Sequence, residues 1–148
     1  MKSKDIIIND KSAKIFIADS LLMTPVVSVA YRAAADLIDK GHSLADPFIR
    51  RDHNVIWIEL DRQVISYIIY DKVIPEVKDL AYIRMSWVHQ DFRGKGIRSI
   101  IEDHFIEELQ LHEIKYVETE THVDNISIDR SYEKLGYKKV YYRRFKKI

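Results

Sequence analysis

Residues 87–105, WVHQDFRGKGIRSIIEDHF, join a strand-like segment to a helix-like one through a turn of glycine and basic residues. The chain has only 4 glycines in 148 residues, and Gly94 and Gly96 are two of them. Glycine adopts left-handed backbone angles cheaply and lets a bound group approach main-chain amides. A strand that turns into a helix here would aim free amides and the positive end of the helix dipole at one point. The turn predicts an anion site with Arg93 and Lys95 at its rim; an ordinary loop before a helix is the alternative, because short glycine motifs are weak evidence.

The overall composition is that of an ordinary globular protein. Hydrophobic residues make up 47% and charged residues 32%, while 24 Lys and Arg nearly balance 23 Asp and Glu. This balance gives no bulk charge that would favour nucleic acid or anionic lipid as a partner. A chain of this length buries roughly 70% of its unfolded surface, so residues 1–148 are predicted to form one domain.

Several missing patterns narrow the chemistry further. The chain contains no cysteine, which excludes a disulfide framework, a thiolate metal site and a cysteine nucleophile. The six histidines are scattered without an HxxxH or HExxH pattern, so no metal is expected. No segment approaches the ~20 apolar residues of a membrane span, and the N-terminal apolar run is too short for a signal peptide. We therefore expect a cytoplasmic protein with no membrane partner.

Strand-like segments dominate the chain up to residue 88. Residues 15–18 are the first candidate, and residues 55–60 and 63–73 flank Asp61-Arg62, which predicts a hairpin with a tight turn. Residues 81–88 form the next predicted strand. Strict alternation would put Ala81, Ile83, Met85 and Trp87 on one face and Tyr82, Arg84, Ser86 and Val88 on the other. Three consecutive strands indicate an antiparallel meander.

Two longer segments show helical spacing. Thr24-Pro25 predicts a helix start, and Gly41 predicts its end. One face of this helix collects its apolar residues, Val26, Ala30, Ala33, Ala34 and Leu37. The second helix is predicted from Gly96 to about Leu111. Its apolar stripe consists of Ile97, Ile100, Ile101, Phe105 and Leu109.

The last third of the chain predicts a strand, a short helix and a further strand. The first strand spans residues 115–123, and Asp124 or Asn125 is predicted to cap a helix that ends at Gly136. Residues 137–148 are predicted to form the last strand. The order strand, helix, strand over residues 81–123 is a crossover unit attached to the meander. The predicted fold class is therefore α+β, with helices on the faces of a mixed sheet.

Two motifs in the second half of the chain resemble a known family. The familiar nucleotide motifs GxxxxGK[ST] and GxGxxG are absent. Instead, VHQDFRGKGIR is followed about thirty residues later by NISIDRSYEKLGYKK, residues 125–139. In order and spacing the pair resembles the GNAT superfamily of acyl-CoA-dependent N-acyltransferases. That resemblance implies a central, mostly antiparallel sheet of about six to seven strands, flanked by about four helices.

The sequence departs from the family pattern at two positions. Gln90 stands where the family usually has proline, and Arg98 stands where it prefers glycine or alanine. A bulky side chain at Arg98 could weaken cofactor binding. It could equally offer its planar guanidinium to a phosphate, for which arginine is well suited.

The resemblance implies a site for acetyl-CoA as co-substrate. The cofactor would lie in a wedge between the strands over residues 81–88 and 115–123, with the backbone near Trp87 and Val88 pairing with pantetheine. The pyrophosphate would be bound by backbone amides of the glycine turn, contributed by Arg93, Gly94, Lys95, Gly96, Ile97 and Arg98. Asn125 and Tyr132 complete the implied cofactor-binding set.

The same resemblance implies the catalytic groups. Tyr132 matches the tyrosine that protonates the departing thiolate, although an aromatic residue on the buried face of its helix would look the same in sequence. Glu120 matches a family position for the general base, with a solvent-facing carboxylate as its alternative and His89 as a second candidate. Two acid/base groups are what amine attack on a thioester requires. Without cysteine, direct transfer to the amine is the simpler route.

The implied function is an acetyl-CoA-dependent N-acetyltransferase whose amine acceptor is a small molecule or a protein. Residues 41–52 are expected to line the acceptor cleft. The alternative is a non-catalytic module that binds acyl-CoA as a sensor or partner-binding subunit. The basic, aromatic tail of residues 137–148 suits a half-buried strand or a homodimer seam. We do not expect a nucleic-acid partner, because lysine-rich edge strands commonly block sheet aggregation.

Overall fold

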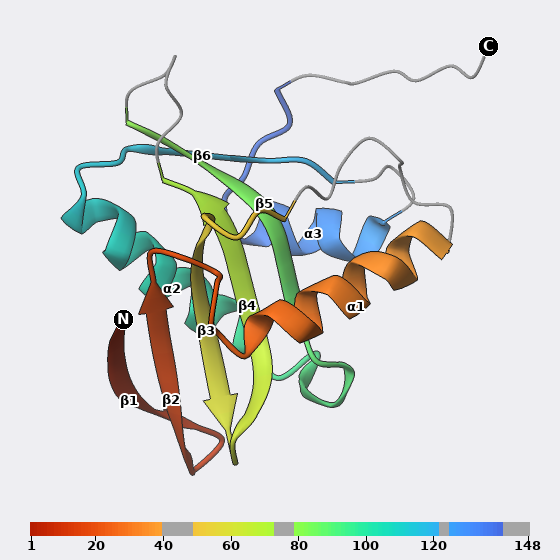
Figure 1. Cartoon of the computed structure of the whole chain (residues 1–148). Helices are drawn as coiled ribbons and strands as arrows, with labels where there is room; N and C mark the ends of the chain where they lie inside the picture. The colour runs from red at the N-terminus through yellow and green to blue at the C-terminus, as the bar shows by residue number, and fades with distance from the viewer. Residues whose placement is uncertain (40–48, 73–78, 122–124, 141–148) are drawn as a thin grey trace.

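Six strands lie side by side in chain order in the computed structural model, which describes residues 1–39, 49–72, 79–121 and 125–140 (Figure 1). Neighbouring strands pair antiparallel, except β5 and β6, which are parallel. The strands are β1 (Lys2–Ile8), β2 (Lys11–Ala18), β3 (Asn54–Leu60), β4 (Gln63–Asp71), β5 (Leu80–Val88) and β6 (Tyr116–Thr119). This confirms the predicted α+β class and the mixed, mostly antiparallel sheet.

The N-terminal hairpin was only partly predicted. The sequence indicated a strand over residues 15–18, whereas β2 begins at Lys11 and pairs along its length with β1. Asn9 and Asp10 connect the two strands at φ 48° and 64°. Asp61 and Arg62 make the predicted β3–β4 turn at φ 51° and 64°. Two consecutive left-handed residues match the twist of the flanking strands. The Asn-Asp pair could therefore have predicted a hairpin, and with it β1.

Three α-helices cover the two faces of the sheet within the described part of the chain. Helix α1 (Val26–Asp39) lies on one face, and α2 (Ile97–Leu111) and α3 (Ile126–Lys134) lie on the other (Figure 1). Helix α1 starts directly after Thr24-Pro25, as predicted, and Gly41 lies outside the described residues. None of the described helices has the length and apolar character needed to span a membrane.

Helix α2 is anchored by the stripe that its sequence predicted. Ile97, Ile101, Phe105 and Leu109 are all buried against the sheet. Phe105 is fully buried and meets Tyr70 of β4 edge to face, with 4.9 Å between the ring centroids. Burying one such side chain contributes about 1.5–3 kcal/mol, which fixes the helix and thereby the glycine turn at its start.

A bulge in β5 overturns the predicted alternation of that strand. Ile69 of β4 pairs with Met85 and Tyr70 pairs with Ile83, so Arg84 is left as an extra residue. Because one extra residue reverses which way the following side chains point, Met85 joins the core under α1, and Val88 joins the core under α2 and α3. The expected grouping of Ala81 and Ile83 with Met85 and Trp87 was therefore wrong.

The predicted boundaries at the C-terminal end are only partly described. Strand β6 covers four of the nine residues predicted for it, and residues 122–124 lie outside the described part. Helix α3 is capped by Asn125, and Gly136 follows its end at φ 91°. Residues 137–140 are not in a strand, and residues 141–148, the remainder of the predicted last strand, lie outside the described part.

Candidate active site

The glycine turn has the backbone geometry of an anion cradle. After a short 3-10 helix (Gln90–Phe92), Gly94 has φ 71°, and Gly96, the N-cap of α2, has φ 77°. No atom lies within 4 Å of where a Cβ would stand on either glycine. The first amides of α2 have no helical partner and point out of the helix start. Buried Ile97 holds this turn against the core.

The basic side chains of the turn are partly occupied with local structure. Arg93 donates from Nε to the Val88 carbonyl at 3.0 Å, which ties the turn back to the end of β5. Lys95 places its Nζ 5.6 Å from the centroid of the Phe92 ring. Both residues are exposed, so their positive charge stands at the rim of the turn, where an anion would be attracted.

Strands β5 and β6 part beyond the bulge. Their parallel pairing runs from Leu80 to Ile83 on β5, and within the described residues no strand pairs with this edge farther along. His89 donates its amide to Ile65 of β4 at 2.8 Å. Since successive residues direct their backbone groups to opposite edges, the amide of Val88 faces the open edge. The wedge therefore offers strand-like hydrogen-bonding groups above the glycine turn.

Tyr132 lies on α3 and contacts the bulged strand β5. Its hydroxyl lies 2.8 Å from Ser86 Oγ, and its side chain is buried. Helix α3 is positioned by Asn125, whose Oδ1 accepts a hydrogen bond from the Ile128 amide at 3.3 Å. The side chain of Asn125 thus serves as a helix cap.

The Arg98 side chain turns toward Tyr132 and Ser86. Its Nη1 donates to Ser86 Oγ at 3.0 Å, and its Cζ lies 5.5 Å from the centroid of the Tyr132 ring. Both the hydrogen bond and the cation–π contact are favourable for a half-buried guanidinium. The two sequence interpretations of Arg98 placed its side chain at the phosphate turn, whereas the side chain bridges α2 to β5.

A buried carboxyl completes this cluster. Glu102 lies one turn after Arg98 on α2, is 5% exposed, and accepts the hydroxyl hydrogen of Tyr137. Burial raises the pKa of Glu102, while the Tyr137 hydrogen bond and the charge of Arg98 oppose that rise. Burial and the nearby Glu102 also raise the pKa of Tyr137. Tyr137 in turn packs edge to face on Tyr132, at 4.9 Å between centroids.

The other predicted acid/base candidates lie elsewhere. Glu120 directly follows β6, whose last residue, Thr119, pairs with Ile83, so it stands where β5 and β6 part. It is exposed. His89 accepts the Asp91 amide at Nδ1 and packs between Trp87 and Phe92. The Trp87 ring stacks on Tyr67, which belongs to the core under α1, with 5.5 Å between centroids.

A second polar cluster lies at the bulge. Arg84 contacts Asp71 with both Nε and Nη2 at 2.6 Å, and buried His53 places Nε2 3.3 Å from the same carboxylate. His53 Nδ1 accepts the Arg50 amide at 3.0 Å, which puts the ring proton on Nε2. Burial lowers the pKa of His53, although Asp71 opposes the shift. The cluster holds the extra residue of β5 in place.

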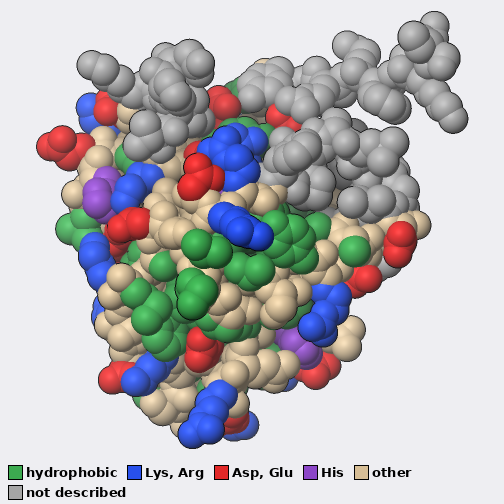
Figure 2. Space-filling model, viewed as in Figure 1, with side chains coloured by type: hydrophobic (Ala, Val, Ile, Leu, Met, Phe, Trp, Pro, Cys, Tyr) green, Lys and Arg blue, Asp and Glu red, His purple; other side chains and the backbone are tan. Residues whose placement is uncertain are grey.

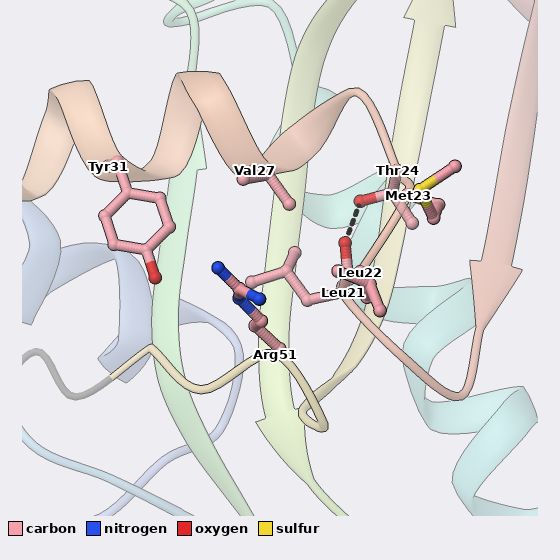
Figure 3. A pocket seen from close by; sticks show the side chains of 7 residues that line it. All are labelled: Leu21, Leu22, Met23, Thr24, Val27, Tyr31 and Arg51. Carbon is pink, nitrogen blue, oxygen red and sulfur yellow. Dashed lines mark hydrogen bonds between the residues drawn. The ribbon is translucent and has the colours of Figure 1, made fainter.

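A shallow hollow of about 420 Å³ lies apart from these residues. Figure 3 shows its lining, which comes from the start of α1, the segment before it and Arg51. Figure 2 shows hydrophobic side chains gathered on this face, where Leu22, Met23 and Tyr31 are at least half exposed. Arg51 belongs to the predicted acceptor loop, residues 41–52, of which 41–48 lie outside the described part. None of the predicted catalytic or cofactor-binding residues lines the hollow.

The site positions of Ser86 and Glu102 and the side-chain role of Tyr137 were not predicted from the sequence. Ser86 was assigned to a face by strict alternation, and the bulge removes the basis for that assignment. Glu102 lies on the apolar side of α2, where a carboxyl group needs a partner. This position was the feature of the sequence that could have indicated its role. No group of three His, Asp or Glu side chains suited to a metal occurs in the described ranges.

Comparison with known proteins gives a matching family model and several similar folds. The model of the acetyltransferase (GNAT) family matches residues 25–137. An aminoglycoside acetyltransferase structure from an uncultured soil metagenomic sample has a TM-score of 0.68 at 12% identity, covering 92% of this chain and 96% of that chain. The ribosomal-protein-alanine N-acetyltransferase of Brucella melitensis biovar Abortus 2308 gives 0.62 at 14%, covering 92% and 99%. An aminoglycoside N-acetyltransferase solved with CoA gives 0.59 at 13%, covering 88% and 98%. No curated protein sequence matches the chain.

The neutral, buried state of His53 predicts a pH-dependent stability. Because its pKa is lowered from 6.5 in the fold, the unfolded chain binds a proton that the folded chain does not. The free energy of unfolding is therefore not reduced by His53 above about pH 6.5. As the pH falls below that value, the free energy of unfolding decreases by up to about 1.4 kcal/mol per pH unit. Urea unfolding between pH 7.5 and 5 should show a shallower decline for His53→Gln than for the wild type. Equal slopes would contradict the assignment.

Proposed function

The chain belongs to the GNAT acetyltransferase family, and on that premise we propose that it transfers an acetyl group from acetyl-CoA to a primary amine. The observation that carries this proposal is the Tyr132 hydroxyl, which stands 2.8 Å from Ser86 on the strand that borders the wedge. An amine acetyltransferase needs a proton donor beside the departing sulfur. Arg98, which follows the glycine turn, lies beside the Tyr132 ring and hydrogen-bonds to the same serine.

The glycine turn fits the pyrophosphate of the co-substrate. Gly94 and Gly96 leave open space above their α-carbons, and the start of α2 supplies amides without helical partners. We assign pyrophosphate binding to the backbone from Arg93 to Arg98, with the charges of Arg93 and Lys95 at the rim. The open edge at Val88 suits the amide groups of pantetheine, which would extend β5 like an additional short strand.

Direct transfer matches the available chemistry. The chain has no cysteine to carry an acyl-enzyme. The amine nitrogen attacks the thioester carbonyl, the carbon–sulfur bond breaks, and Tyr132 gives its phenolic proton to the departing thiolate. Glu120 is the proposed base that receives the proton lost by the amine, directly or through water. Its position after the last β5–β6 pair supports this role.

The acceptor is assigned only as a class, a small-molecule amine or a protein N-terminus or lysine. The structural neighbours include an aminoglycoside acetyltransferase and a ribosomal-protein-alanine acetyltransferase, which take acceptors of both kinds according to their names. Residues at the start of α1 and in the 49–52 segment lie on the face of the sheet opposite α2 and α3. An acceptor approaching from that face would meet the thioester from the side opposite Tyr132.

A non-catalytic acyl-CoA-binding module is the second candidate. The Arg98 side chain favours it, because a guanidinium lies beside Tyr132 and comes from a position where the family pattern prefers glycine or alanine. Release of free CoA in the presence of a panel of primary amines separates the two functions. A sensor would bind the thioester and release no CoA beyond the uncatalysed rate.

Substitution of Gly96 tests the cradle. An alanine at φ 77° is strained by about 1–2 kcal/mol, and its methyl group would occupy the open space above the turn. Gly136→Ala, at φ 91° and with equally open space, is the matched control for strain. We expect calorimetry to show at least a tenfold loss of CoA affinity, about 1.4 kcal/mol, for Gly96→Ala only. Equal affinities in the two variants would exclude the turn as the pyrophosphate site.

Removal of the Tyr132 hydroxyl tests the general acid. Tyr132→Phe should lower kcat by ~10²–10⁴, or roughly 3–5 kcal/mol of barrier, with little change in CoA affinity. The control is Tyr116→Phe, because Tyr116 is 65% exposed on β6. A Tyr132→Phe enzyme with wild-type kcat would remove this residue from the mechanism.

The base is tested separately with Glu120→Gln. The amide keeps the size of the side chain but cannot accept the amine proton at neutral pH, so kcat should fall by about 10²-fold. Glu113→Gln, at an exposed position after α2, is the control. If raising the pH restores little of the rate lost in Glu120→Gln, deprotonation of the free amine in solution does not replace the role of Glu120. Wild-type turnover by Glu120→Gln would leave water as the base.

A further inference from the structure

We propose that Arg98 and Ser86 form a directional hydrogen-bond relay that turns the Tyr132 hydroxyl proton toward the wedge. The proposal rests on the function assigned above and adds two positioning residues to it. Arg98 acts through Ser86, and Ser86 acts through Tyr132. Neither side chain is needed to bind pyrophosphate in this scheme, because Arg98 contributes only its backbone amide to the glycine turn.

The direction of the relay follows from counting donors and acceptors. A guanidinium has only donors, so Arg98 must give its hydrogen to Ser86 Oγ. The 2.8 Å contact between Ser86 and Tyr132 can run either way. If Tyr132 donated, the Ser86 hydrogen would have no acceptor in the described surroundings. If Ser86 donates, each of its groups is used once, and the Tyr132 hydrogen remains available for the sulfur.

The surroundings hold Arg98 in this arrangement. The Tyr132 ring lies 5.5 Å from its Cζ, and Glu102 stands one helical turn farther along α2. Glu102 is itself held by the Tyr137 hydroxyl, and the Tyr137 ring packs on Tyr132. The positive charge therefore stays beside the phenol rather than extending into solvent.

The relay also serves the state that follows proton transfer. The Tyr132 oxygen–hydrogen bond breaks, a sulfur–hydrogen bond forms on CoA, and the phenolate is left with the Ser86 hydroxyl as donor. Arg98 stabilises that phenolate through Ser86, because hydrogen bonds to charged groups contribute more than neutral ones. Tyr132 regains its proton from solvent before the next turnover.

The test uses the full chain and two measurements. Variants are Arg98→Met, Arg98→Lys and Ser86→Ala, each alone and combined with Tyr132→Phe. Arg130→Met is the matched control, because Arg130 is exposed on the same helix as Tyr132. The first measurement follows ionisation of the CoA thiol in the bound state by ultraviolet absorbance against pH. The second compares kcat and KM for acetyl transfer.

We expect the thiol of bound CoA to ionise at a pH about one unit higher in Arg98→Met and Ser86→Ala than in the wild type, because Tyr132, the donor to the thiolate, is then no longer oriented and polarised through Ser86. The same variants should lower kcat by about 10- to 100-fold with little change in KM for acetyl-CoA. Arg98→Lys should recover part of both effects. In the Tyr132→Phe background the second substitution should change neither value further.

Several results would overturn the relay. One is that the thiol titration and kcat of Arg98→Met and Ser86→Ala equal those of the wild type. Another is that these substitutions lower kcat equally with and without the Tyr132 hydroxyl. Tighter CoA binding and faster turnover by Arg98→Met would show instead that Arg98 obstructs the wedge. If the wild type transfers acetyl to no amine while the thiol titration still shifts as expected, the proposed function fails and the relay stands. Failure to bind CoA would remove both.

Discussion

Arg84 is an extra residue in the register between β4 and β5, and it reverses the faces to which the rest of β5 points. Without it, Ser86 would point toward α1 and could not meet Tyr132. The same position marks the end of the β5–β6 pairing, because Ile83 is the last paired residue. A bulge increases the local bend of a strand and is difficult to accommodate beside a regular parallel partner. The contacts of Arg84 Nε and Nη2 with one oxygen of Asp71, Oδ2, stabilise the bend with the support of buried His53.

The glycine turn and the buried cluster share α2, so the proposed anion site and the proposed acid are mechanically linked. Ile97 and Phe105 fix the helix in the core. Its first turn presents open backbone, and the next residues carry Arg98 and Glu102 toward Tyr132 and Tyr137. A single rigid helix can thus set the anion-binding end and the environment of the phenol together. The arrangement also explains how a large side chain at Arg98 is accommodated: it lies along the sheet side of the helix.

Much of this architecture was predictable because it depends on local patterns. The β3–β4 hairpin, the burial of Ile101 and Phe105, the Asn125 cap and the crossover unit all follow from residue periodicity and turn chemistry. Strand β1 was missed because KSKD is polar, as suits an exposed edge strand, and only its Asn-Asp turn indicated a hairpin. The faces of β5 were wrong because a bulge adds one residue without any required sequence signal.

The sequence by itself determined the fold class, the family motifs and the glycine turn. These features depend on residues close together in the chain, whose periodicity and backbone preferences are visible in a single sequence. The candidate roles of Tyr132 and Glu120 are implied only by the resemblance to the family. The tertiary structure decided where the Arg98 guanidinium goes and that Ser86 joins Tyr132. It also decided that Glu102 is a buried partner of Tyr137. Each of these contacts joins residues that meet only when α2 and α3 pack on the bulged strand, and no local rule specifies that meeting.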